Sequence, residues 1–196
     1  MNLDFFKFPS TPHLITLGNV DIRHDKVMAE TERETFLMHD LVVEEKVDGS
    51  NLGISFDMEG SLYVQNRGAY LSFPASGQWN KLEEWLALRT EDLFDHLIDQ
   101  FILFGEWCYA RHSVFDDRLP YWFLGFDIYD KRVGRFLSTM CRDRILNRLN
   151  IARVPTITHG RLTLDELKQF LTQSKLSDQP AEGLYLRVDQ GEWIKQ

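Results

Sequence analysis

Cysteine is scarce in this sequence, with only Cys108 and Cys141 in a chain of 196 residues. Their spacing fits neither a zinc-binding motif nor a disulfide framework, which favours a reducing compartment and two free thiols. The sequence also lacks a run of 18 uncharged apolar residues, and its N-terminus lacks the basic and apolar regions of a secretory signal. We therefore expect a cytoplasmic protein that does not span a membrane.

An excess of positive charge is also lacking, because the net charge is −8 at pH 7. This argues against a protein that coats nucleic acid by charge alone. Basic residues do gather between Lys131 and Arg153, where seven of them accompany a single acid, Asp143, and give the segment a net charge of +6. Such a segment is compatible with binding a polynucleotide end, and equally with a solvated helix surface.

Hydrophobic residues make up 43% of the chain, which suits one globular domain with a substantial core. Apolar patterns with a period of two predict strands, and apolar residues three and four positions apart predict helices. Strands are expected at 41–46, 52–56, 62–66, 101–107, 121–130 and 182–188, and helices at 78–100 with an interruption near Thr90, at 138–149 and at 163–171. Residues 1–40 are expected to contain little regular structure. The fold class is therefore α+β with antiparallel sheets.

The stretch EEKVDGSN, residues 44 to 51, places a lysine at the end of a predicted strand. A turn at 48–51 separates strands 41–46 and 52–56, so the spacing predicts that these strands pair as part of a β-meander. In that turn Asp48 would hydrogen-bond the backbone and Gly49 would supply unusual backbone dihedrals. Lys46 is then either an ordinary surface lysine of a hairpin or a nucleophile, and this stretch alone does not decide between them.

Five further segments follow in order: NRG at 66–68, FGEW at 104–107, FLGFDIYD at 123–130, EGLYLR at 182–187 and a terminal strand with Lys195. The series resembles the covalent nucleotidyltransferase superfamily of ATP-dependent ligases and capping enzymes, and within it the small RNA ligases related to RNA ligase 2 of bacteriophage T4. The resemblance extends from about Thr11 to the last residue. It implies one nucleotidyltransferase (adenylyltransferase) domain over 1–196 that ends within or before the last family motif, with no OB-fold domain.

The resemblance implies catalytic roles for four residues. Lys46 would be the nucleophile that takes AMP from ATP as a lysyl phosphoramidate, and Glu182 the carboxylate that assists the catalytic metal ion. Lys195 would reach the α-phosphate of ATP, and Arg67 would engage the 5′-phosphate end. The chemistry itself calls for such groups, because only about one free lysine in 2,500 is neutral at pH 7 and neutralising it costs roughly 4.6 kcal/mol.

The resemblance also implies contacts with the nucleotide. Glu45 would meet the adenine edge, Asn51 the ribose and phosphate, Glu106 the ribose hydroxyls and Phe126 the face of the adenine. The complete set expected to bind ATP is Glu45, Lys46, Asn51, Arg67, Glu106, Phe126, Glu182 and Lys195. From the residues alone, Phe126 also fits a core position, and Arg67 and Glu182 also fit exposed positions. A carboxylate such as Glu106 in an apolar strand is costly to bury without a partner, which favours a ligand-facing role.

The implied function is an ATP-dependent RNA ligase that seals RNA 5′-phosphate and 3′-hydroxyl ends, as in RNA repair, and uses ATP with Mg²⁺ or Mn²⁺. Three alternatives remain open at this point: a DNA ligase core, a GTP-dependent capping enzyme, and a non-catalytic relative that binds nucleotides or RNA ends.

Overall fold

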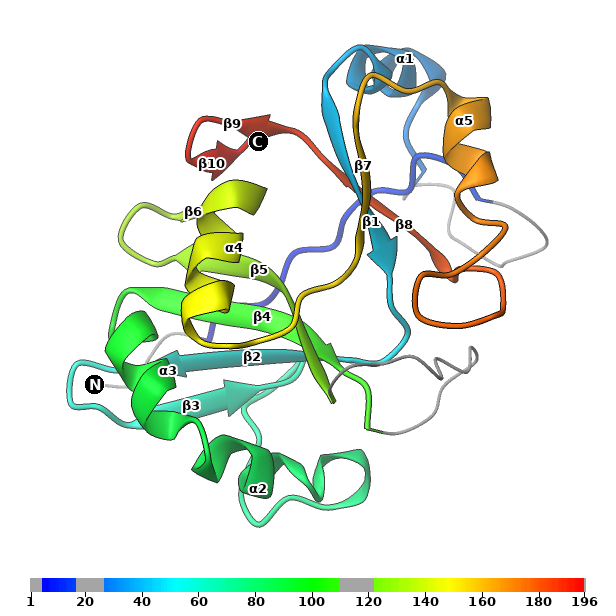
Figure 1. Cartoon of the computed structure of the whole chain (residues 1–196). Coiled ribbons are helices and arrows are strands. Elements are labelled where there is room, and N and C mark those ends of the chain that lie inside the picture. The colour runs from blue at the N-terminus through cyan, green and yellow to red at the C-terminus, as the bar shows by residue number, and fades with distance from the viewer. Residues whose placement is uncertain (1–4, 17–26, 110–121, 196) are drawn as a thin grey trace.

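Two antiparallel β-sheets form the frame of the molecule in a computed structural model of the chain (Figure 1). The structure describes residues 5–16, 27–109 and 122–195. A five-stranded sheet has the strand order β3-β2-β4-β5-β6, and a three-stranded sheet has the order β7-β1-β8. The expected α+β class with antiparallel sheets is confirmed.

The five-stranded sheet contains the strands that follow Lys46 in the sequence. They are β2 (Ser50–Phe56), β3 (Leu62–Gln65), β4 (Phe101–Trp107), β5 (Phe123–Asp130) and β6 (Arg135–Phe136). The register places Asn51 of β2 opposite Glu106 of β4, and Glu106 opposite Leu124 of β5. Residues that are far apart in sequence therefore share one face of the sheet.

Three helices cover the other face of this sheet: α2 (Leu82–Ala87), α3 (Thr90–Leu97) and α4 (Thr139–Arg148). Leu52 and Ile54 of β2 are fully buried there and pack with Leu93 of α3 in the main hydrophobic core. Successive side chains of a strand point to opposite faces. Because the helices take one face, Asn51 and Glu106 point away from them.

Strand β1 (Leu41–Lys46) is the centre of the three-stranded sheet, between β7 (Thr156–Gly160) and β8 (Gly183–Arg187). Leu41 and Val43 are buried with apolar residues of α1 (Glu30–Leu37) and α5 (Leu164–Gln169). Glu44 and Lys46 alternate with them and therefore point to the opposite side of β1. Pairing of β1 with β8 places Lys46 opposite Gly183.

The expected pairing of strands 41–46 and 52–56 is wrong. Strand β1 pairs with β7 and β8, whereas β2 pairs with β3 and β4. Residues 47–49 therefore cross from one sheet to the other instead of closing a hairpin. Both edges of β1 bond to strands more than a hundred residues away in sequence, and a local turn pattern does not reveal such partners. Only the β2–β3 part of the predicted meander is confirmed.

The helix predictions are confirmed with small differences at the ends. The predicted helix at 78–100 consists of α2 and α3, separated at Leu88–Arg89 and preceded by the short 3-10 helix η2 (Gly77–Trp79). At the start of α5, Thr163 Oγ1 accepts from the Glu166 backbone N–H (3.3 Å), and the Glu166 carboxylate accepts from the Thr163 N–H (2.8 Å).

Helix α1 contradicts the expectation of little regular structure before residue 40. It has no buried residue and a highly charged sequence, so the periodic apolar signal that predicts a helix is weak there. The last described strands form a short hairpin of β9 (Asp189–Gln190) and β10 (Trp193–Ile194). Asp189 and Gln190, which as a sequence look like turn residues, are paired strand residues, and the turn lies at 191–192. In the described ranges, no helix is long and apolar enough to cross a membrane.

Candidate active site

A cleft of about 1660 Å³ lies between the two sheets and is lined by residues from both. All eight residues predicted for the site line this cleft: Glu45, Lys46, Asn51, Arg67, Glu106, Phe126, Glu182 and Lys195. The cleft thus brings together segments that span most of the sequence.

Lys46 ends β1 with its side chain about half exposed, and its Nζ forms an ion pair with the Glu182 carboxylate. Glu182 directly precedes β8, and the β1–β8 register brings it to the lysine. An ammonium group held by a carboxylate is not a nucleophile. A cation that occupied the Glu182 carboxylate would release the amine from this pair.

Asn51 and Glu106 lie side by side on the cleft face of the five-stranded sheet. Asn51 Oδ1 is buried and has no hydrogen-bond partner among the described residues. Buried polar atoms nearly always have a partner in folded proteins. The unpaired oxygen therefore favours a ligand with a hydrogen-bond donor at this position, which agrees with the predicted contact with the sugar.

The carboxyl group of Glu106 is largely neutral at pH 7. Burial raises the pKa of Glu106 to about 8; the negative charge of Glu182 adds to this shift, and Lys46 and Arg67 oppose it. A neutral carboxyl group both donates and accepts hydrogen bonds. Glu106 can therefore pair with hydroxyl groups of a ligand without repelling a polyphosphate.

Replacing Glu106 with glutamine should remove part of the pH dependence of stability. The pKa of Glu106 in the folded protein lies above the ordinary value of 4.5 for a glutamate. The unfolded chain therefore releases this proton first, and stability falls by up to about 1.4 kcal/mol per pH unit between roughly pH 4.5 and 8. Urea unfolding of both proteins at pH 5, 6.5 and 8 checks this. The variant should gain stability relative to the wild type as the pH rises, and parallel curves would contradict the assignment.

Gly49 lies directly against strand β4. A Cβ atom at this position would be 2.7 Å from Glu106 Cγ and 2.8 Å from the Trp107 carbonyl oxygen. The expectation that Gly49 provides unusual dihedrals is wrong, since its φ is not among the positive values. The glycine is required instead for the close approach of the segment after Lys46 to β4.

Replacing Gly49 with alanine should therefore displace both Glu106 and the segment that follows Lys46. We expect a loss of stability of about 1–3 kcal/mol. We also expect covalent nucleotide transfer, if Lys46 is the nucleophile, to slow by about 10²-fold through misplacement. Gly68→Ala is the matched control, because a Cβ there would meet only Asn66 Oδ1 at 3.8 Å. Equal effects of the two substitutions would show that the approach to β4 is unimportant.

Phe126 belongs to both the core and the cleft. It lies on β5, lines the cleft and packs at the edge of two apolar clusters. Its ring meets that of Phe8 at 5.3 Å in an edge-to-face arrangement. The core role and the predicted stacking role are therefore compatible, because one part of the residue is packed and another borders the cleft.

Glu45 also lines the cleft, but its carboxylate is occupied by protein groups. The side chain is 3% exposed and accepts hydrogen bonds from the Ser174 hydroxyl and from the Lys175 backbone N–H (2.7 Å). Glu45 thereby anchors the loop that leads to Glu182. Its contact with the adenine edge stays a prediction, and the sequence contained no signal for its partners in this loop.

Arg67 and Lys195 occupy different parts of the cleft. Arg67 follows β3 and interacts electrostatically with Glu106. Lys195 Nζ lies 2.9 Å from His39 Nε2, just before β1 begins. Strand β1 is about 20 Å long, and Lys46 is at its other end. The structure therefore does not bring Lys195 to Lys46, and its contact with the α-phosphate stays a prediction.

A model of a known protein family, described as RNA ligase, matches residues 39–196 of the chain. The chain belongs to the RNA ligase family. A search of curated proteins finds no match. The match covers Lys46, both walls of the cleft and Glu182, so the site described above lies within the region that defines the family.

Solved structures of an RNA ligase from Naegleria gruberi share the fold. A variant of that ligase with ATP and Mn has a TM-score of 0.62 and 21% identity over 82% of this chain and 50% of that chain. The same ligase with pyrophosphate has a TM-score of 0.59 and 22% identity, over 80% and 48% respectively. The chain thus spans about half the length of these structures, and at this identity the likeness shows the fold.

A buried ionic network lies beside the cleft of this RNA ligase family member, and the sequence did not reveal it. Glu44 accepts from both terminal nitrogens of Arg142 (2.6 and 3.1 Å) and pairs with Arg187 (2.9 Å). Arg187 also donates to Asp127 (2.7 Å). All four side chains are at most 2% exposed. The network connects β1, β5, β8 and α4.

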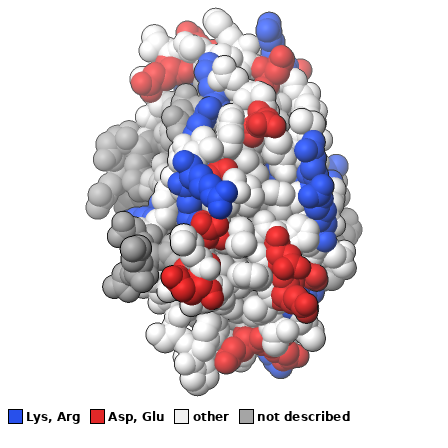
Figure 2. Space-filling model, turned by 90° about the vertical axis from the view of Figure 1, so that its left-hand side faces the viewer, with Lys and Arg blue, Asp and Glu red and all other residues white. Residues whose placement is uncertain are grey.

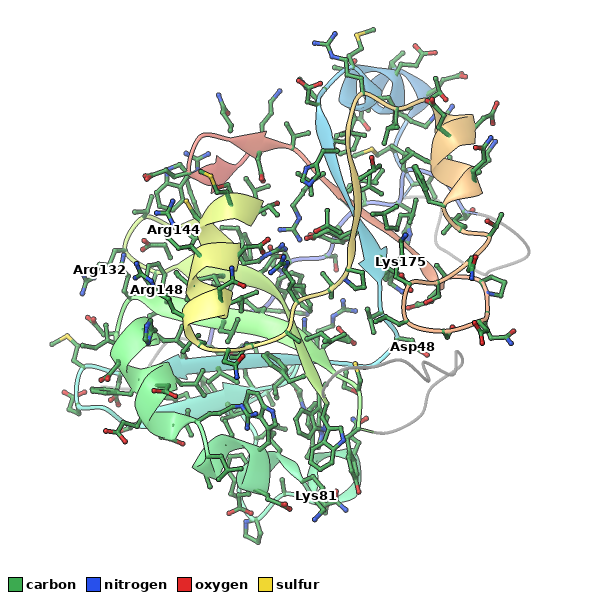
Figure 3. The ribbon with its side chains drawn as sticks, in the orientation of Figure 1. Asp48, Lys81, Arg132, Arg144, Arg148 and Lys175 are labelled. Atoms are coloured by element: carbon green, nitrogen blue, oxygen red, sulfur yellow. The ribbon has the colours of Figure 1, made fainter. Side chains whose placement is uncertain are left out.

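The basic segment between Lys131 and Arg153 does not form one exposed strip. Arg142 is buried in the ionic network, Arg132 pairs with Asp99 (2.8 Å) and Arg153 with Asp143 (3.3 Å). Figure 3 shows Arg132, Arg144 and Arg148 on the α4 side of the molecule, away from Asp48 at the end of β1. On the face in Figure 2, basic and acidic side chains are interspersed. The segment is therefore partly structural, and binding of a polynucleotide end by its exposed arginines stays a prediction.

Proposed function

We propose that this chain is the adenylyltransferase domain of an ATP-dependent RNA ligase similar to RNA ligase 2 of bacteriophage T4. The observation that supports this most directly is the position of Lys46. It pairs with Glu182 in the same cleft that contains Asn51 and Glu106, within the part of the chain matched by the family. The neighbouring residues provide partners for a base, a sugar and a metal-bound phosphate.

In the first step, the neutral amine of Lys46 attacks the α-phosphorus of ATP. A P–N bond forms, the bond between the α-phosphorus and the bridging oxygen of pyrophosphate breaks, and the nitrogen loses a proton. Pyrophosphate leaves, and AMP remains on Lys46 as a phosphoramidate. The amine becomes available only when its ion pair with Glu182 is broken.

The other residues of the cleft would hold the nucleotide during this step. Phe126 offers a face on which a base stacks without strong discrimination between bases. The unpaired Asn51 Oδ1 accepts from a ribose hydroxyl, and the neutral Glu106 carboxyl group can donate or accept beside it. Together these contacts direct the α-phosphate toward the end of β1.

Glu182 is the residue best suited to bind a divalent cation in this cleft. Among the described residues there is no group of three or more acidic, histidine or cysteine side chains that could hold a metal ion alone. This donor set fits Mg²⁺ or Mn²⁺ bound by one carboxylate together with substrate phosphates. When bound there, such an ion would offset the charge of the polyphosphate and stabilise the leaving pyrophosphate.

In the later steps AMP passes from Lys46 to an RNA 5′-phosphate, which forms a 5′-5′ pyrophosphate linkage. A 3′-hydroxyl then attacks the RNA phosphorus, a phosphodiester bond forms and AMP departs. Arg67, which lies at the cleft near Glu106, is the proposed partner of the 5′-phosphate. Neither Cys108 nor Cys141 forms a disulfide, which supports our further proposal of a cytoplasmic location.

Intact-protein mass spectrometry after incubation with nucleotide and Mg²⁺ tests the covalent step. We expect a species heavier by one AMP with ATP and no adduct with GTP. A GMP adduct would instead favour a capping enzyme. Tight ATP binding with no adduct in either Mg²⁺ or Mn²⁺ would favour a non-catalytic binding protein.

A panel of nicked duplexes tests the choice of polymer. Each nick carries a 5′-phosphate and a 3′-hydroxyl, with RNA or DNA on either side of the break. We expect sealing when RNA supplies the ends. Sealing of all-DNA nicks at an equal or higher rate would favour a DNA ligase core.

A further inference from the structure

Arg187 contacts both walls of the cleft. Its guanidinium group donates to Asp127 (2.7 Å) and to the Phe126 carbonyl oxygen (3.2 Å), both on β5. It also pairs with Glu44 of β1 at 2.9 Å. Its Cζ lies 4.9 Å from the centre of the Tyr185 ring, which lines the cleft from β8. Because Arg187 is almost completely buried, water does not substitute for these partners.

Both carboxylate partners of Arg187 lie close in sequence to residues of the proposed ATP site. Glu44 is two residues before Lys46 and points to the same side of β1. Asp127 follows Phe126, whose carbonyl oxygen also accepts from Arg142 at 2.7 Å. The guanidinium group therefore connects the strand of the nucleophile directly to the backbone of the aromatic residue on the opposite wall.

We propose that Arg187 is a positioning residue for ATP, which holds the wall that carries Phe126 at a fixed distance from the strand that carries Lys46. A base stacked on Phe126 then presents its α-phosphate to Lys46. This inference rests on the proposed function. A planar guanidinium with several donors can bridge a carboxylate on each wall and a carbonyl oxygen at once, whereas a lysine ammonium lacks this fixed fork.

A purely structural role for Arg187 makes a different prediction from a positioning role. Removing one partner of a buried ion pair destabilises a protein, because the other charge is left uncompensated. Neutralising both partners restores much of the stability. Neutralising both partners does not restore the hydrogen bond to the Phe126 carbonyl oxygen or the contact with the Tyr185 ring. Such a double variant should therefore regain stability without regaining ATP affinity, and this outcome distinguishes the two roles.

Equilibrium dialysis with ATP and Mg²⁺ provides the test, with each variant made in a Lys46→Ala background so that no covalent adduct forms. We expect Arg187→Met to lower the unfolding midpoint and to weaken ATP binding by about tenfold or more. In Arg187→Met combined with Asp127→Asn, the midpoint should recover while ATP binding stays weak. Recovery of ATP binding together with stability, or unchanged binding in Arg187→Met, would overturn the proposal.

Asp130→Asn is the matched control for a buried carboxylate on the same strand. Asp130 is 3% exposed, accepts from Gln100 Nε2 and the Arg132 N–H at 2.8 Å each, and does not line the cleft. Its substitution should lower stability without changing ATP affinity.

Adduct formation by the wild type is measured separately. Binding of ATP without an adduct would contradict the ligase proposal and leave the Arg187 comparison valid, whereas no binding at all would contradict both.

Discussion

Lys46→Ala should abolish the AMP adduct and leave the fold intact. The side chain is about half exposed and its ion pair with Glu182 is not buried, so its removal leaves no buried charge without a partner. Without the amine no phosphoramidate forms, and adduct formation should fall by about 10⁴-fold or more. Intact-protein mass spectrometry with ATP and Mg²⁺ measures the adduct, and thermal unfolding checks the fold.

Lys175→Ala is the matched control for Lys46→Ala. Lys175 is an exposed lysine whose backbone, rather than its side chain, bonds to Glu45 beside the nucleophile (Figure 3). Its substitution should leave the adduct at the wild-type level. A stoichiometric adduct in the Lys46 variant would remove Lys46 from the mechanism.

Glu182→Gln should have the second-largest effect. The substitution keeps the shape of the side chain but removes the charge that pairs with Lys46 and that would bind the divalent cation. We expect adduct formation to slow by about 10²-fold or more, a magnitude typical for the loss of one preorganised electrostatic group in a catalytic site. Single-turnover kinetics over a range of Mg²⁺ concentrations measures both the rate and the demand for the metal ion.

Glu192→Gln serves as its control, because Glu192 is an exposed glutamate in the turn between β9 and β10. It should react like the wild type at every Mg²⁺ concentration. If Glu182→Gln also reacted like the wild type, the main role of Glu182 would be its structural pair with Lys46, and the proposed metal ligand would have to be sought elsewhere.

Local sequence patterns predicted the positions of helices and strands better than they predicted which strands pair with each other. The alternation in residues 182–188 predicted β8, and the capping box at Thr163 predicted the start of α5. Both signals depend on neighbours in sequence. The strands beside β1 start at Thr156 and Gly183, and nothing within residues 41–46 specifies them. Strand pairing is decided by contacts across the whole chain, which explains the wrong hairpin.

The candidate site residues were predicted from the family resemblance that the order of several short segments carries, since Lys46 alone was ambiguous. All eight line one cleft, yet their partners were not predictable. Glu45 shows why: its strand position was correct, but Ser174 and Lys175 occupy its carboxylate from a loop 129 and 130 residues away. Arg142 looked like one cation of a basic segment, and only tertiary packing reveals that it is buried against Glu44.

The short link between β1 and β2 limits how the cleft can change its width. Residues 47–49 span at most about 10 Å even when extended, and Gly49 is already packed against β4. The two sheets therefore cannot separate at the Lys46 end. The opposite end of the three-stranded sheet is also tied to the five-stranded sheet, because the Ser138 N–H donates to the Glu192 carbonyl oxygen (2.8 Å) and the Thr139 N–H to Asp189 (2.9 Å). A wide opening of the cleft would therefore require these contacts to break, whereas the width beside Lys46 is limited by the covalent link itself.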